Sequence, residues 1–153
     1  MIVTATGDLL DVPVGIICHQ VNCRGAFGAG IAAQIAGKWP VVERVYRSHL
    51  VRCADAGVRP LGTVSYCAVA PGLTVANLYA QLSYGNGARE GRCYTDYGAL
   101  RSCLEKVRLE FGWDVPMHVP YRIGCGLAGG DWKAVRPILE EFGVTVVRRP
   151  CDM

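Results

Sequence analysis

The chain divides into short apolar runs separated by glycine-rich loops and amphipathic stretches. The apolar runs are rich in β-branched and aromatic residues, which predicts strands. They lie at 2–5, 15–21, 63–70, 73–80, 116–121 and 144–149. Pro71 and Gly72 separate the third run from the fourth and predict a hairpin turn. A helical pattern extends over 31–51, and Pro40 predicts a break within it.

Two further helices follow from the spacing of apolar residues. Between 97 and 111 they recur at steps of three and four, which predicts an amphipathic helix capped by Thr95 or Asp96. A helix is also expected over 132–142, ended by Gly143. Strands that alternate with helices, together with one hairpin, predict an α/β fold with a mixed sheet covered by helices on both faces.

The polar stretch at 83–92 contains too much glycine for a regular element to be expected. A chain of 153 residues has the length of one domain, so we expect a single domain over 1–153.

Composition restricts the class of protein. Hydrophobic residues make up 51% of the chain and charged residues 19%, which excludes a disordered or fibrous chain. Neither a membrane span nor a signal peptide is recognisable, so we expect a cytoplasmic protein without a membrane partner. The eight cysteines lie within predicted strands and helices and are expected to be reduced. Cys18, His19 and Cys23 are too few for a zinc site, so neither a metal nor a cofactor is expected.

Two glycine-rich loops each follow a predicted strand and precede a predicted helix, at 21–32 and 122–130. Ligands bind at this position in open α/β sheets, and a helix N-terminus favours an anion. Glycine lets the main chain approach phosphate oxygens closely, so the two loops could hold a diphosphate from both sides. The alternative is that both loops are only tight turns. The net charge of +3, without a block of basic residues, suits a small anion at least as well as a nucleic acid.

The sequence context of the two loops differs from that of two known phosphate-binding motifs. Residues 124–129 fit the Gly-x-Gly-x-x-Gly pattern, but this pattern lies near the end of the chain and no acidic residue ends the strand after it. A nicotinamide dehydrogenase is therefore not expected. Neither loop continues into Gly-Lys-Ser/Thr, which excludes a P-loop.

Four blocks in this order resemble the macrodomain family of ADP-ribose-binding modules. They are TGDLL (6–10), CHQVNCRGAFGAGIA (18–32), ANLYAQ (76–81) and RIGCGLAGGDW (122–132). The resemblance covers essentially the whole chain and is nearest to small stand-alone macrodomains of the ADP-ribose 1″-phosphate phosphatase and terminal ADP-ribose glycohydrolase group. It implies a three-layer α/β/α fold with a mixed central sheet flanked by helices.

The resemblance also implies roles for individual residues. Asp8 would accept a hydrogen bond from the adenine amino group and Leu9 would contribute its backbone N–H, although Asp8 also suits a turn. His19 and Asn22 would lie near the distal ribose, and Asn77 would orient water or ribose hydroxyls. The walls of the diphosphate site would be Gly28, Ala29, Gly30 and Ile31 on one side, and Ile123, Gly124, Cys125, Gly126 and Leu127 on the other.

The candidates for catalysis are Asp131, His19 and Gln81. Asp131 would be the general base for a water near the distal ribose, or a cap of the helix that follows it. His19 would relay a proton, or it would be a hydrogen-bonded core histidine. In the glycohydrolase branch a lysine and an aspartate stand where this chain has Gln81 and Ala128. A glutamine forms no Schiff base, so a lysyl intermediate is not expected.

The expected function is therefore hydrolysis of ADP-ribose 1″-phosphate or an ADP-ribosyl ester by water. The alternative is a reader that binds ADP-ribose without chemistry. A third possibility is a reactive Cys125, against a cysteine that only packs beneath its loop. The expected partner is ADP-ribose or an ADP-ribosylated substrate, with nucleic acid only as such a substrate, and the protein is expected to be a monomer.

Overall fold

The computed structural model describes residues 2–152, which form a six-stranded mixed sheet in the order β1-β6-β5-β2-β4-β3. The strands are β1 (Val3–Thr6), β2 (Gly15–Asn22), β3 (Val64–Ala70), β4 (Leu73–Gln81), β5 (Met117–Pro120) and β6 (Thr145–Arg148). The hairpin strands β3 and β4 are antiparallel, whereas all other neighbours are parallel. The predicted α/β fold with a mixed sheet is confirmed.

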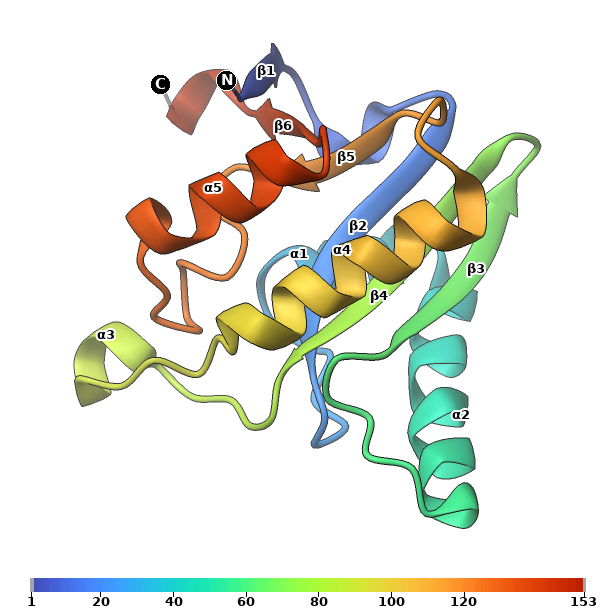
Figure 1. Cartoon of the computed structure of the whole chain (residues 1–153), viewed down its shortest axis with the longest axis vertical. Coiled ribbons are helices and arrows are strands. Elements are labelled where there is room, and N and C mark those ends of the chain that lie inside the picture. Colours follow the sequence, from blue (N-terminus) through green and yellow to red (C-terminus); the bar gives the residue numbers. More distant parts are fainter. Residues whose placement is uncertain (1, 153) are drawn as a thin grey trace.

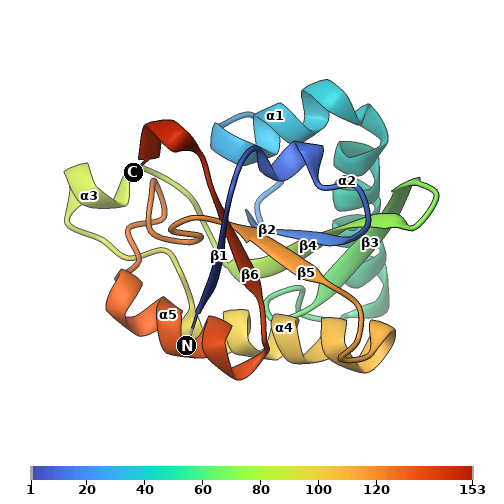
Figure 2. The ribbon, with the colours of Figure 1, turned by 90° about the horizontal axis from the view of Figure 1, so that it is seen from above.

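Helices cover both faces of this sheet (Figures 1 and 2). Figure 2 shows α1 (Gly30–Lys38) and α2 (Pro40–Ala56) on one face, and α4 (Tyr97–Phe111) and α5 (Trp132–Glu141) on the other. The remaining helices are short: η1 (Leu9–Asp11), α3 (Gly87–Glu90) and η2 (Pro150–Asp152). No helix within residues 2–152 is both long enough and apolar enough to cross a membrane.

Two hydrophobic clusters hold the three layers together, one on each face of the sheet. The central strands β2 and β4 are buried along almost their whole length, as expected for strands covered on both faces. Successive side chains of a strand point to opposite faces. Ile16 and Leu78 therefore pack towards α4, whereas Ile17 and Tyr79 pack towards α1 and α2.

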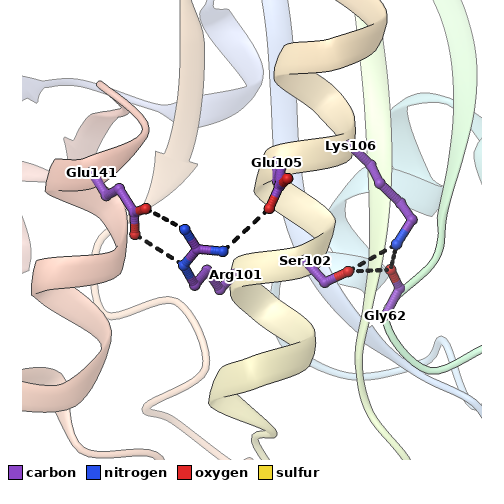
Figure 3. Close-up of polar contacts among 6 residues, drawn as sticks. All are labelled: Gly62, Arg101, Ser102, Glu105, Lys106 and Glu141. Atoms are coloured by element: carbon purple, nitrogen blue, oxygen red, sulfur yellow. Dashed lines mark hydrogen bonds and ion pairs between the residues drawn. The ribbon is translucent and has the colours of Figure 1, made fainter.

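Polar contacts on the surface of α4 join it to its neighbours (Figure 3). Arg101 pairs with Glu141 of α5 and, 3.2 Å away, with Glu105 of its own helix. Lys106 donates to the carbonyl of Gly62, 2.9 Å away, in the segment before β3. Exposed pairs of this kind contribute about 0–1 kcal/mol each. They support the packing of α4 but do not determine it.

The local signals placed the six strands and the four longer helices to within a few residues. Pro40 is the first residue of α2, where a missing N–H is tolerated, so the predicted break is confirmed. Asp96 caps α4, with its side chain accepting from the N–H of Ala99, so the hydroxyl of Thr95 is not the cap. The expectation of no regular structure over 83–92 is wrong for α3, which Asn86 caps through the N–H of Arg89.

Candidate functional site

A cavity of about 640 Å³ opens at the carboxyl ends of the parallel strands. Both predicted glycine loops line it, one after β2 and one after β5. β2 lies between β5 and β4, and the chain leaves β2 towards α1 on one face and β4 towards α4 on the other. The cavity therefore occupies the point where the connections change faces, which is the usual ligand site of an open α/β sheet.

The first loop takes its shape from Asn22, the last residue of β2. The Oδ1 of Asn22 accepts from the N–H groups of Arg24 and Ala26, at 2.9 and 3.2 Å, and its Nδ2 donates to the carbonyl of Ala26 at 2.7 Å. The hydroxyl of Tyr46 lies 2.9 Å from Oδ1 of Asn22 and accepts from the N–H of Gly25 at 3.0 Å. Asn22 lines the cavity, and its side chain is occupied in holding the loop.

Gly28 is not required by the fold. Its φ is not positive, and a Cβ at this position would meet nothing within 4 Å. Ala29 is the N-cap of α1 and provides no side-chain cap for the first N–H groups of this helix, and Gly30 and Ile31 in its first turn line the cavity. A glycine in open space beside an uncapped helix N-terminus is what close approach of an anionic ligand requires.

The second loop contains one glycine that the fold requires and one that it does not. Gly124 has a φ of +75°, and a Cβ there would lie 2.9 Å from Oε1 of Gln20 and 3.0 Å from Oγ1 of Thr95. Gly126 has no positive φ, and a Cβ would meet nothing within 4 Å. Gly28 and Gly126 thus both line the cavity, one in each wall, at positions where a Cβ would meet no protein atom.

One end of the cavity is formed by Asp8 and Leu9 together with Arg149 and Asp152. Asp8 caps η1 through Oδ1, which accepts from the N–H of Leu10 at 2.9 Å. Its second carboxylate oxygen has no hydrogen bond within residues 2–152, so it remains available as an acceptor. The predicted turn role and the predicted ligand role of Asp8 are therefore compatible.

Amide side chains line another part of the cavity, at the end of β4. Oε1 of Gln81 accepts from Nε2 of Gln20 at 2.9 Å, and Nε2 of Gln81 donates to the carbonyl of Ser83 at 2.9 Å. Ala128 also lines the cavity. Both positions at which the chain departs from the glycohydrolase pattern thus face the cavity, and neither side chain there is a nucleophile or an acid.

His19 and Asn77 do not reach the cavity, which corrects their predicted place beside the ligand. Both are fully buried, and Nε2 of His19 lies 2.6 Å from Oδ1 of Asn77. Position 19 shares a face of β2 with Ile17, so the imidazole points into the α1 and α2 side of the core, edge-on to Phe27. Burial lowers the pKa of His19 to about 4, partly opposed by the Asn77 hydrogen bond, so the ring is neutral near pH 7. The core histidine is the alternative that the structure supports.

Asp131 and Cys125 lie outside the cavity lining. Asp131 is the N-cap of α5, and its Oδ1 accepts from the N–H of Lys133 at 2.9 Å. Cys125 is buried, and burial raises the pKa of its thiol to about 11, although Arg122 opposes this effect. A protonated, buried thiol favours the packing role of Cys125 over the nucleophilic one.

Sequence reasoning missed several residues of the site, among them Gln20, Arg122 and Thr95. Gln20 and Arg122 line the cavity, and Thr95 lies beneath the second loop. Arg122 has a φ of 60° and is the one non-glycine residue with a positive φ in the described part of the chain. Within residues 2–152 no group of histidine, cysteine or acidic residues is arranged to hold a metal ion.

The comparisons with known proteins agree with this geometry. No protein-family model matches the chain. An ADP-ribose 1″-phosphate phosphatase of Saccharomyces cerevisiae is 28% identical over 83% of this chain and 83% of its own length. Fungal proteins of the same name from Ajellomyces capsulatus and Aspergillus clavatus match over only 44 residues, so the chain spans 17% and 22% of those relatives.

Solved structures match over nearly the full length. A Bacteroides thetaiotaomicron protein of unknown function superimposes with a TM-score of 0.84 at 30% identity, covering 97% of this chain and 98% of that one. A macrodomain protein from Streptomyces coelicolor superimposes with a TM-score of 0.74 at 27% identity, again covering 97% and 98%. With its sheet order, its two glycine loops and these relatives, the chain belongs to the macrodomain family.

Proposed function

We propose that this macrodomain binds ADP-ribose derivatives and hydrolyses them. The observation that carries the proposal is the pair of unneeded glycines, Gly28 and Gly126, which clear both walls of one cavity. A diphosphate between them would accept hydrogen bonds from the N–H groups at the start of α1 and in the second loop. Asp8, with its free carboxylate oxygen, suits the amino group of an adenine.

The chemistry that these residues support is attack by water. Gln81 has its amide fixed by Gln20 and Ser83, so it orients groups by hydrogen bonding and forms no covalent intermediate. Asp131 uses Oδ1 to cap α5, and its second carboxylate oxygen would accept the proton of the attacking water. Its charge reaches the second loop, where it adds to the effect of burial on Cys125. We assign Asp131 the role of general base and the loop N–H groups the stabilisation of negative charge.

The substrate class follows from the curated relatives. The Saccharomyces cerevisiae protein is named for hydrolysis of ADP-ribose 1″-phosphate. Gln81 and Ala128 are themselves uncharged, so a phosphate on the distal ribose would meet no repelling carboxylate from either of them. An ADP-ribosyl ester is the second candidate substrate. Cytoplasmic action and a monomeric state stay predictions from the sequence.

A non-catalytic reader is the alternative function, and one observation favours it. Of the three predicted catalytic residues, Gln81 lines the cavity, whereas Asp131 and His19 do not. Calorimetry with ADP-ribose, run beside phosphate-release assays on the 1″-phosphate and ester-hydrolysis assays, separates the two functions. We expect binding together with product formation. Binding without product from any linkage would establish the reader, and the absence of binding would contradict both.

A further inference from the structure

Thr95 is a buried residue at the point where two strands and the second glycine loop meet. It directly precedes Asp96, which already caps α4, so the helix does not need the Thr95 hydroxyl. Oγ1 of Thr95 instead donates to the carbonyl of Gly124 at 2.6 Å. It also accepts from Nε2 of Gln20 at 2.9 Å. The hydroxyl thus donates its one proton to the loop and accepts a hydrogen bond from Gln20 of β2.

The carbonyl of Gly124 is also the point at which the second loop closes. The N–H of Gly130 donates to it at 2.8 Å, so the beginning and the end of the loop converge on one oxygen. The N–H of Tyr94 donates to the carbonyl of Ala128 at 2.6 Å, which ties the middle of the loop to the residue before Thr95. The Thr95 segment therefore contacts the loop at its base and along its cavity side.

Gln20 keeps the Thr95 hydroxyl in this orientation. Its amide donates both to Oγ1 of Thr95 and to Oε1 of Gln81, while its own Oε1 is buried without a partner. Leaving a buried acceptor unpaired destabilises a fold. Oε1 of Gln20 thus lacks a hydrogen bond, whereas Nε2 of Gln20 holds the side chains of both Thr95 and Gln81.

We infer that Thr95, oriented by Gln20, is a positioning residue that holds the second glycine loop in the shape that binds the diphosphate. This inference rests on the proposed function and explains how the loop is prepared for it. A loop that is already ordered loses less conformational entropy when ligand binds. Gly124 completes the arrangement, because a larger residue would collide with the side chains that hold its carbonyl.

The test is the affinity of Thr95→Val for ADP-ribose, measured by calorimetry. Valine keeps the shape of threonine and removes the hydroxyl, so we expect the dissociation constant to rise about tenfold. Thr95→Ser restores the hydroxyl and should return the constant to within about twofold of wild type. Thr63→Val is the matched control, because Oγ1 of Thr63 also donates to a backbone carbonyl at 2.6 Å, but to that of Pro60 in the segment before β3 and not to the second glycine loop.

The outcomes separate this inference from the proposed function. If the wild-type protein does not bind ADP-ribose, the proposed function fails. If it binds and Thr95→Val binds equally well, only the inference about Thr95 fails. Equal losses of affinity in Thr95→Val and Thr63→Val would also overturn it, since they would show a general effect on the fold. Should Thr95→Val not fold, Gln20→Met removes the donor that orients Thr95, and an unchanged affinity in that variant would count against the inference.

Discussion

His19 and Asn77 lie directly opposite each other on the neighbouring strands β2 and β4, with 2.6 Å between Nε2 and Oδ1. Burial lowers the pKa of His19 from its ordinary value of 6.5 to about 4. Between these two pH values the imidazole is therefore largely protonated in the unfolded chain and largely neutral in the folded chain. The free energy of unfolding is therefore unaffected by His19 above pH 6.5 and falls as the pH drops from 6.5 to about 4.

We expect His19→Gln to reduce this pH dependence. The slope contributed by one such histidine is at most about 1.4 kcal/mol per pH unit. Urea unfolding at several pH values between those two limits measures it. Burial also lowers the pKa of His49 and of His118, so the quantity to compare is the difference in slope between wild type and variant. An identical slope in both proteins would show that His19 is protonated in the fold and would contradict the neutral core histidine.

Gly28 can be tested against a glycine of the adjacent helix. Gly28 lines the cavity and a Cβ there would meet no protein atom, so we expect the bulk of Gly28→Val to weaken ADP-ribose binding by at least about tenfold. Its free energy of unfolding should change by less than about 1 kcal/mol. Gly37→Val is the control, since a Cβ there also meets nothing within 4 Å and the residue does not line the cavity. Calorimetry that finds equal affinities for both variants would remove the first loop from the binding site.

Much of the fold could be predicted from local patterns, because most strands and the longer helices have an apolar pattern bounded by a recognisable cap, proline or glycine. Pro40 and Gly143 mark element ends through their backbone chemistry alone. The short helix α3 could not be predicted in the same way. It depends on one Asn86 cap within a glycine-rich segment, and a four-residue helix leaves no periodicity to detect.

The site was predictable where backbone chemistry defines it, as in both glycine loops. The site was not predictable where it depends on the direction in which a side chain points. β2 is apolar on both faces, so its pattern does not show that Gln20 faces the cavity while His19 faces the core. The role of Thr95 depends on contacts with Gly124, 29 positions later in the chain, and with Gln20, 75 positions earlier. Only the folded chain brings these residues together.

The second loop gives a contrast between two glycines that differ in backbone conformation and in the space around them. Gly124→Ala places a Cβ at a φ of +75° and within 3.0 Å of Gln20 and Thr95. We expect it to lower the free energy of unfolding by about 1–3 kcal/mol. Gly126→Ala meets nothing within 4 Å and should leave stability within about 0.5 kcal/mol of wild type while still weakening ADP-ribose binding. Urea unfolding of the two variants, followed by calorimetry, checks both statements. A stable Gly124→Ala protein would mean that the loop is not held as described.

Asp131 allows the helix cap and the general base to be tested separately. Asparagine caps a helix about as well as aspartate, whereas alanine costs about 1 kcal/mol at such a position. Asp131→Asn should therefore keep the stability of α5 and the affinity for ADP-ribose. It cannot take a proton from water, so turnover of the 1″-phosphate should fall at least about a hundredfold.

Asp96→Asn is the matched control for this prediction, because Asp96 also caps its helix with a 2.9 Å hydrogen bond and does not line the cavity. We expect the turnover of this variant to equal that of wild type. Steady-state phosphate release by both variants, with thermal unfolding alongside, distinguishes the roles. If Asp131→Asn turned over at the wild-type rate, Asp131 would be a helix cap alone and the base would have to be sought among the residues that line the cavity. A large loss confined to Asp131→Asn would place the chemistry next to the second loop and exclude the reader.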